Sequence, residues 1–447
     1  MAQTIAERVT ARPARTSRRG AGVQRFTAGW AALGVTLSGA TQLRIEGLPA
    51  GPSELILALW ILFVLLLLLR GIPFTAGRVF FGLAGYWLLA LALLGLGALV
   101  AIQTLKVSSY AARDAAAFLY LAVLVPLLAV RLGDQSAGDY HLRMARMLFV
   151  FQGGSAALLL GMATVANDFA PVSLWYGVIR FRGWADNPNQ MALAMVAMPF
   201  LGWWLLRQTS GRVGKAACLL GIAVCIIAGF ATRSDSLRVA WVASFGAIGA
   251  LLFYRVTMRG RSRWLYVSHV VIPVLVVAVG VVYGDAVVGY LSRVAEDVYA
   301  ESDQGELRFT LWSHAIEVIN LSPFVGFGPG AYSGLFGPFQ NFEAHNALID
   351  WGMSTGLSGI ALHLALWGWC LWRAFRSNSP ALLGMAVSLM AGVMFGYFFR
   401  HPTYWTILLL VLVLSEGRTK GADGLSRQRW PQAATGLGAA RKTLRPG

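Results

Sequence analysis

The sequence predicts an all-α integral membrane protein that crosses the bilayer about twelve times. Hydrophobic residues make up 57% of the 447 positions and charged residues only 13%, which excludes an ordinary water-soluble domain. The apolar residues form runs of about 17 to 25, the length at which a helix spans the hydrocarbon core. These runs do not alternate between polar and apolar positions and are too long for barrel strands, so a membrane β-barrel is also excluded.

The predicted spans follow the apolar runs in order along the chain. One long external loop, residues 284–344, separates the ninth span from the tenth. The twelve predicted spans cover residues 26–43, 53–70, 77–101, 113–130, 145–166, 189–207, 213–230, 237–255, 264–283, 345–372, 380–399 and 403–416.

These spans form one membrane domain, residues 26–416. The flanking segments, residues 1–25 and 417–447, are rich in arginine, glycine and alanine and poor in apolar residues. We therefore expect them to be disordered basic tails. The first apolar run begins too far from the start, behind basic residues, for an ordinary cleaved signal peptide, so we expect a retained anchor.

Lysine and arginine are distributed unequally between the two sides of the predicted bundle. With the N-terminus inside, 27 of the 37 basic side chains fall on the inner side and ten on the outer side. This positive-inside pattern predicts cytoplasmic termini and an external 284–344 loop. It also explains the net charge of +17 without a nucleic-acid partner, and we expect the tails to contact anionic lipids.

The sequence contains no motif for a metal or a bound cofactor, and we expect neither. Cys218, Cys225 and Cys370 all fall inside predicted spans, where they are expected to pack as small apolar side chains. No P-loop, dinucleotide fingerprint or zinc-ligand spacing is present.

The long outer loop contains a helical pattern followed by a glycine-rich segment. Leu307, Leu311, Ile316 and Ile319 recur at helical spacing, which predicts a short helix lying in the membrane interface. We interpret the glycine-rich segment as a loop that can approach a ligand closely, with a tight surface loop as the alternative. Its glycines are Gly326, Gly328, Gly330, Gly334 and Gly337.

His345 and Asn346 stand at the head of the tenth span, where water meets lipid. An ionisable side chain is costly to hold at such a place, so His345 is a functional candidate. Gly352, Gly356 and Gly359 fall on the same helical face, which predicts a small-residue stripe for close helix packing. His345 would then lie at the mouth of a tight helix–helix junction.

Four polar segments follow one another along the chain. They are Arg182-Gly183 with Asn187-Pro188-Asn189; Ser236-Leu237-Arg238; Arg308 with Trp312, Pro323 and Gly326-Phe327-Gly328; and His345-Asn346 with Gly356 and Gly359. Their order resembles the O-antigen ligase and polymerase superfamily of bacterial membrane glycosyltransferases, over roughly residues 180–360 by motif. The family often has a Ser-Arg pair, whereas Leu237 separates Ser236 from Arg238 here. Either Arg238 or Arg233 can therefore match the family arginine.

The resemblance implies that the donor is a glycan on undecaprenyl diphosphate. It also implies transfer to an acceptor hydroxyl at the outer face, with inversion and without a metal ion. The outer arginines suit this chemistry, because the planar guanidinium forms paired hydrogen bonds with phosphate oxygens. Arg238 and Arg308 are the predicted diphosphate clamp, Arg182 is a third candidate, and Arg233 is the alternative to Arg238.

His345 is the predicted general base, because an imidazole with an ordinary pKa of about 6.5 can take the proton of a sugar hydroxyl. The alternatives are that it only orients the acceptor or is structural. Asn346 is expected to cap the next helix or to position His345. His401 is also external and either contacts sugar or is a plain turn residue. His269 and His363 lie within spans, where we expect packing or hydrogen bonding.

The preferred prediction is a polymerase of O-antigen or exopolysaccharide repeat units in a bacterial inner membrane, with its active site facing the periplasm. The first alternative is a ligase that transfers a finished glycan to lipid A–core. A transporter of lipid-linked glycans or a secondary transporter is the alternative from another class, although charges at span ends favour an enzyme. The expected partners are the lipid-linked donor, a glycan or lipid A–core acceptor, membrane lipids and other polysaccharide export proteins.

Overall fold

The computed structural model describes most of the membrane domain and confirms an all-α membrane fold. Seven described helices are long and apolar enough to cross a bilayer, counting Pro188–Gln208 as one. Each predicted span except 264–283 overlaps a described helix, and that span lies outside the described residues. The described residues are 16–44, 51–132, 137–166, 168–169, 171–177, 179–259, 303–332, 342–396 and 398–428.

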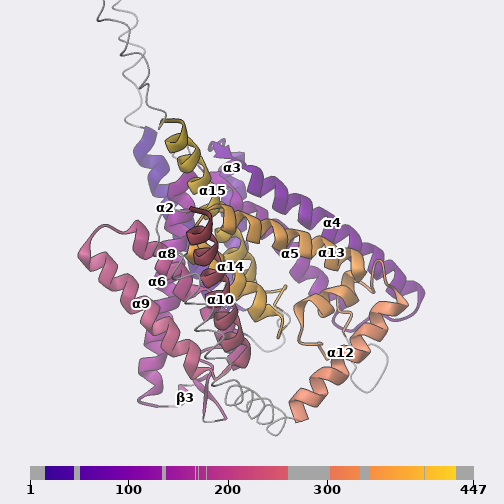
Figure 1. Cartoon of the computed structure of the whole chain (residues 1–447). Coiled ribbons are helices and arrows are strands. Elements are labelled where there is room, and N and C mark those ends of the chain that lie inside the picture. The colour runs from indigo at the N-terminus through magenta and orange to yellow at the C-terminus, as the bar shows by residue number, and fades with distance from the viewer. Residues whose placement is uncertain are drawn as a thin grey trace, which may run out of the picture.

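The described helices follow the apolar runs closely. They are α2 (Thr16–Leu37), α3 (Pro52–Leu69), α4 (Arg78–Gln103), α5 (Ala111–Ala129), α6 (Ala137–Ala163), α7 (Pro188–Val196), α8 (Met198–Gln208), α9 (Arg212–Ala231), α10 (Asp235–Arg259), α12 (Asp303–Leu321), α13 (Ala347–Arg376), α14 (Pro380–Val393) and α15 (Pro402–Gln428), with a 3₁₀ turn, η1, at Thr41–Leu43. Figure 1 shows α9 on one side of the bundle and α4 and α13 on the other.

Short antiparallel strand pairs join the helix ends. At one end, β1 (Phe74–Thr75) pairs with β2 (Arg131–Leu132), with Phe74 opposite Leu132. At the other end, the segment between α6 and α7 folds into two small hairpins. These are β3 (Asp168–Phe169) with β4 (Val172–Ser173), and β5 (Trp175–Tyr176) with β6 (Arg180–Phe181).

The predicted span 189–207 is two helices rather than one. α7 ends at Val196 and α8 begins at Met198, with Pro199 in the first turn of α8. Proline has no N–H and its ring clashes with the preceding turn, which accounts for the break. Helical structure also extends into the predicted tails, because α2 already begins at Thr16 and α15 continues to Gln428. The outermost tail residues, 1–15 and 429–447, lie outside the described residues.

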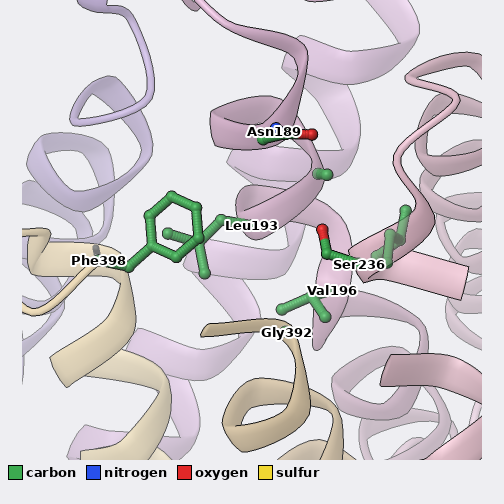
Figure 2. A pocket seen from close by; sticks show the side chains of 8 residues that line it. Asn189, Leu193, Val196, Ser236, Gly392 and Phe398 are labelled. Carbon is green, nitrogen blue, oxygen red and sulfur yellow. The ribbon is translucent and has the colours of Figure 1, made fainter. Parts of the chain in front are cut away.

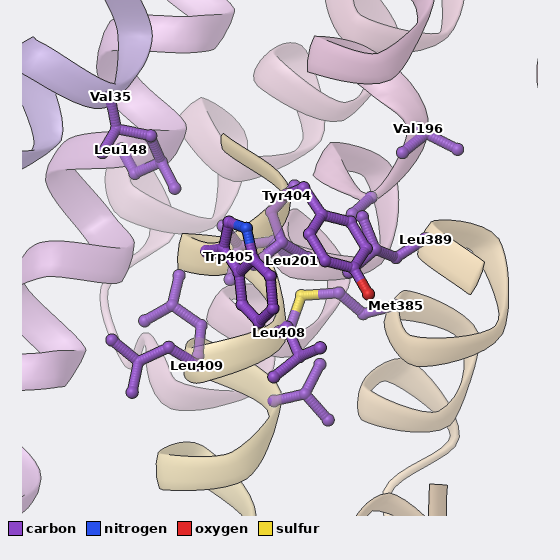
Figure 3. Close-up of a cluster of buried hydrophobic side chains, with 14 of the residues drawn as sticks. Val35, Leu148, Val196, Leu201, Met385, Leu389, Tyr404, Trp405, Leu408 and Leu409 are labelled. Carbon is purple, nitrogen blue, oxygen red and sulfur yellow. The ribbon is translucent and has the colours of Figure 1, made fainter. Parts of the chain in front are cut away.

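The core is built around α15. Residues 402–415 are all buried, so this helix is enclosed on every side and needs no polar face. Figure 3 shows Tyr404, Trp405 and Leu408 of α15 among aliphatic side chains of neighbouring helices. His363 of α13 lies in the same core, with its two ring nitrogens 2.7 Å from Tyr86 Oη and 2.8 Å from Tyr404 Oη. The hydrogen-bonded role predicted for His363 is confirmed, while His269 lies outside the described residues.

The helical pattern in the long loop is confirmed as α12, which packs against α13. Leu311 and Ile319 are buried, whereas Ile316 is half exposed. The glycine-rich segment that follows differs from its interpretation. Gly326 and Gly328 have φ angles of +65° and +75°, where a side chain is strained. Their close contacts are with the backbone of α13 and α4, which favours the alternative of a tight loop. Gly334 and Gly337 lie outside the described residues.

The predicted glycine stripe of α13 is interrupted. Gly356 has φ +67° and ψ −171°, so α13 breaks there. A Cβ at Gly356 would lie 2.3 Å from the carbonyl carbon of Phe324, and Leu357 N donates to Pro323 O at 2.7 Å. Gly356 therefore packs against the loop after α12, and the prediction of a continuous helix–helix stripe headed by His345 is wrong.

Candidate active site

A cavity of about 870 Å³ opens at one end of the bundle. The last residues of α2 and α14, or the segments that follow them, line the cavity on the chain's way out of these helices. The first residues of α3, α5, α7, α13 and α15, or the segments before them, line it as well, and α12 lies beside them. These are the helix ends that the charge distribution assigned to one face. Its polar lining consists of Thr41, Arg44, Glu54, Arg113, Asp114, Asn187, Asn189, Gln190, Arg308, Glu343, His345, Arg400 and His401.

His345 lies on the wall of this cavity, two residues before α13. Its φ is +54°, a left-handed conformation that is uncommon for a residue with a side chain. The buried carboxylate of Asp350 accepts the backbone N–H of Ala344 at 2.7 Å and that of Asn346 at 3.1 Å. The two peptide groups that flank His345 are thus held by one side chain. The imidazole itself is exposed toward the cavity.

Asn346 is the N-cap of α13. Its side-chain oxygen accepts the N–H groups of Leu348 at 3.1 Å and Ile349 at 3.3 Å, which otherwise lack partners at a helix start. The capping role predicted for Asn346 is therefore confirmed. Because the cap fixes where α13 begins, it also fixes the place from which His345 enters the cavity.

Arg308 is brought to the same cavity from α12. One turn further along α12, Trp312 Nε1 donates to Ala344 O at 2.7 Å, so the helix is tied to the peptide that precedes His345. Among the described residues Arg308 makes no side-chain hydrogen bond or ion pair, and its guanidinium is half-buried. An arginine in this position has its donors available to an anionic ligand.

The charges around His345 set its protonation state. Burial by the surrounding protein lowers the pKa of His345 below its usual value, Glu343 opposes that shift, and Arg308 adds to it. The ring faces the cavity on one side, which accounts for its exposure. Protein surrounds its other sides, which accounts for its lowered pKa. A lowered pKa leaves the imidazole neutral near pH 7, the state in which it can accept a proton.

An ion-pair network surrounds Arg400, which the sequence indicated only as one of several outer cations. Its Nη1 lies 2.7 Å from Asp114 Oδ1 and 2.7 Å from Tyr332 Oη, and its Nη2 bonds Glu343. Tyr332 Oη donates to Asp114 Oδ2 at 2.9 Å. Asp114 is buried, so its charge is compensated by these partners. The network links α5, the loop before α13 and the start of α15.

Sequence reasoning did not assign Asp114, Tyr332 or Glu343 to the site. A signal for Asp114 was available, because it is a carboxylate in the first turn of a predicted span and an intramembrane charge has a partner by default. Glu343 stands two residues before His345, but nothing in the sequence shows that it faces Arg400. That pairing joins residues far apart in the chain and depends on the tertiary fold.

His401 also lines the cavity, as an external histidine that contacts sugar would. Its Nδ1 lies 3.4 Å from Ser38 Oγ, and its Nε2 is buried without a hydrogen-bond partner. Burial and the charge of Arg44 lower the pKa of His401 to about 4, so the ring is neutral at pH 7. His401 is therefore a hydrogen-bonding group of the cavity rather than a cation.

The other predicted arginines are placed elsewhere. Arg238 is exposed on α10 and pairs with Asp235 at 3.0 Å, and Arg233 is exposed in the turn before that helix. Arg182 donates to the backbone carbonyls of Ser173 at 3.0 Å and Asp186 at 3.1 Å, which holds the β-hairpin segment together. None of the three lines the 870 Å³ cavity. Their part in diphosphate binding stays a prediction.

A second, much smaller space adjoins the cavity. Figure 2 shows Phe398 on one side of it and Ser236 and Val196 on the other, with Asn189 above and Gly392 below. Its volume is about 10 Å³, room for roughly one water molecule and not for a sugar. Asn189 and Phe398 line both spaces, so the crevice is a side recess of the larger site.

Comparison with known families identifies part of the chain. Residues 227–364 match the family model described as O-antigen ligase. The match includes Arg233, Arg238, Arg308, His345 and Asn346, and it confirms the predicted relationship to the O-antigen ligase and polymerase superfamily. Arg182, Arg400 and His401 lie outside the matched segment. A search of curated proteins and a search of solved structures each returned no significant match.

Proposed function

Since the chain carries the O-antigen ligase domain within a multi-pass membrane protein, we propose that it transfers a glycan from a polyprenyl diphosphate to a sugar hydroxyl. The domain itself indicates a glycosyltransferase-type membrane enzyme with a lipid-linked donor and a membrane acceptor. The undecaprenyl carrier, the inverting chemistry and the placement in a bacterial inner membrane with the site on the periplasmic side belong to the proposal.

One observation carries the proposal: a neutral imidazole and an arginine without a protein partner among the described residues share a large cavity. His345 and Arg308 are the two residues concerned. Transfer from a diphosphate needs a base for the attacking hydroxyl and positive charge for the leaving group. The site supplies both at the end of the bundle where α2 ends and α15 begins.

The proposed step is a single displacement at the anomeric carbon. The unprotonated ring nitrogen of His345 takes the proton of the acceptor hydroxyl while that oxygen bonds the anomeric carbon. The bond between the anomeric carbon and the diphosphate oxygen breaks, and its electron pair leaves with the diphosphate. Attack from the face opposite the leaving group inverts the anomeric configuration. Arg308 stabilises the charge that develops on the departing oxygens.

Within this reaction class, polymerisation of repeat units is the first choice. The acceptor is then the non-reducing sugar of a second lipid-linked unit, and the chain grows on undecaprenyl diphosphate. Ligation of the glycan to lipid A–core is the second candidate, which the description of the matching family favours. The two share the donor and the proton transfer, and they differ only in the acceptor.

The test uses purified protein with a short undecaprenyl-diphosphate glycan in the presence of EDTA. We expect a ladder of longer lipid-linked glycans on a gel, which is the product pattern of a polymerase. A single adduct that forms only after addition of lipid A–core would identify a ligase instead. Absence of product with either acceptor, and no release of undecaprenyl diphosphate, would contradict the proposed function.

A further inference from the structure

The residues that line the cavity form two chemically different sets. The first set, Arg113, Asp114, Arg308, Glu343 and Arg400, is dominated by charge, and we call it the charged wall. The second set comes from the end of α2 with its 3₁₀ turn, the start of α7 and His401. It presents mainly neutral polar groups, with Arg44 paired to Glu54 at 3.4 Å at its edge. We call this second set the amide wall and define it as Thr41, Asn187, Asn189, Gln190 and His401.

The three side-chain amides of this wall are all held by their oxygen atoms. Asn187 Oδ1 accepts the backbone N–H of Asn189 at 2.8 Å. Asn189 Oδ1 accepts from Arg180 Nη2 at 3.2 Å and from Ser234 Oγ at 3.0 Å. A backbone N–H and a guanidinium can only donate, so these contacts fix which end of each amide is oxygen.

Gln190 is held through the hydroxyl of Thr41. The backbone N–H of Asp186 donates to Thr41 Oγ1 at 2.8 Å, and Thr41 Oγ1 donates to Gln190 Oε1 at 2.7 Å. In the part of the chain that the structure describes, the NH₂ groups of Asn187, Asn189 and Gln190 have no hydrogen-bond partner. Three amides that line the cavity therefore have donors that the described residues leave unused.

Gln42, in the adjoining turn, shows that this arrangement is not general. Its Nε2 donates to the carbonyls of Ser173, Gly183 and Ala185, and its Oε1 accepts the N–H of Ser173. Gln42 is thus fully used in holding the hairpin segment against the end of α2. The amides that line the cavity are the ones whose donors the fold leaves unused.

His401 borders these amides as a neutral, hydrogen-bonded ring. Ser38 Oγ donates to Val35 O at 2.7 Å, so its single proton is already used. Ser38 Oγ also lies 2.9 Å from Thr403 Oγ1, and a proton on His401 Nδ1 is the arrangement compatible with these contacts. Nε2 has no partner among the described residues. Because Nε2 is buried, the groups left for a ligand are the neutral amide donors, and these match a hydroxyl-rich ligand, whose oxygen atoms accept hydrogen bonds.

We propose that the amide wall is the binding subsite for a sugar of the acceptor glycan, with Asn189 and Gln190 as residues that determine acceptor recognition. This inference rests on the proposed function and deepens it. The donor's diphosphate requires cations, which the charged wall provides. Its lipid requires an apolar surface, which Leu55 and Ala58 of α3 and Ala116 and Ala117 of α5 provide on the cavity lining. The neutral amide wall is the part of the cavity left for the acceptor.

The test separates the two substrates chemically. The donor is the undecaprenyl-diphosphate glycan, and the acceptor is the methyl glycoside of the same glycan, which has no leaving group and can only accept. Gln190→Glu and Asn189→Asp keep the oxygen that each residue uses within the fold and remove the NH₂ donor. Gln190→Met removes the donor without adding charge. Gln103→Glu, at the exposed end of α4 and outside the cavity, controls for added charge.

We expect the three cavity variants to raise the KM for the methyl glycoside by about five- to tenfold, the usual effect of losing one neutral hydrogen bond to a ligand. The KM for the lipid donor should stay within about twofold, and Gln103→Glu should match the wild type. Unchanged acceptor KM values, or a rise confined to the donor KM, would overturn the amide-wall proposal. A wild-type protein that neither transfers glycan nor releases undecaprenyl diphosphate would instead overturn the proposed function.

Discussion

At the scale of single residues, His345 enters the cavity from a strained backbone conformation. A non-glycine residue at positive φ costs about 1–3 kcal/mol, and such a residue persists only when its surroundings determine it. Here Asp350 binds the peptide groups on both sides of His345 and Asn346 caps the next helix. The strain thus serves to hold an imidazole toward the cavity, a placement that a regular helix start does not provide.

The charge of Glu343 is predicted to tune this imidazole. Glu343 raises the pKa of His345, in opposition to burial and to Arg308. A base must be unprotonated, so the transfer rate should fall as the pH drops through the pKa of His345. Glu343→Gln removes the opposing charge, and the acidic limb of the pH–rate profile should therefore move to lower pH. The measurement is the transfer rate between about pH 4.5 and 8.

A control for this prediction is Glu317→Gln, which removes a carboxylate of α12 that pairs with His314 and does not line the cavity. Its pH–rate profile should match the wild type. A shift of the Glu343→Gln profile toward higher pH, or no shift, would show that Glu343 does not act on the catalytic imidazole.

At the scale of elements, the loop after α12 and the break in α13 form one packed unit. Phe327 N donates to Met353 O at 2.8 Å, and Gly328 N donates to Ser354 O at 2.9 Å. On its other side the loop lies against α4, where Gly97 leaves room for it. This unit fixes α12, with Arg308, relative to α13, with His345 before it.

The contact between α4 and the loop yields a stability prediction. A Cβ at Gly97 would lie 2.4 Å from Gly328 N and 2.7 Å from Val325 O, which are backbone atoms that cannot rotate away. Gly97→Ala should destabilise the protein by about 1–3 kcal/mol, the usual cost of overpacking. Thermal unfolding in detergent measures it. Gly95→Ala is the matched control on the same helix, because a Cβ there meets nothing within 4 Å.

Gly95→Ala should be neutral or slightly stabilising, since alanine favours a helix over glycine. Equal thermal stability of the two variants would contradict the packed unit.

The same elements show why the sequence prediction was incomplete. The glycine spacing indicated a close approach along α13, and Gly356 makes one with the loop after α12, but periodicity assumes a continuous helix. The left-handed conformation at Gly356 depends on packing against the loop after α12, and the sequence pattern does not indicate that contact.

At the scale of the whole molecule, the order of spans and the basic side chains predicted which helix ends share a face. The structure brings the ends of α2, α3, α5, α7, α13 and α15 to one cavity, and both His345 and Arg308 line it. The pairing of Arg400 with Asp114 and Glu343 could not be predicted from the sequence, because no local sequence pattern indicates which helix ends come into contact. For the same reason Arg238 and Arg182, chosen for their motifs, lie outside the cavity.

The most direct test of the account is the single-turnover transfer rate of His345→Ala with the undecaprenyl-diphosphate glycan bound. Loss of general base catalysis predicts a rate about 10²- to 10⁴-fold below wild type, with donor binding retained. His314→Ala, which removes a partly buried histidine of α12 outside the cavity, should keep the wild-type rate. A His345→Ala rate within about twofold of wild type would contradict the central claim that this imidazole removes the acceptor's proton.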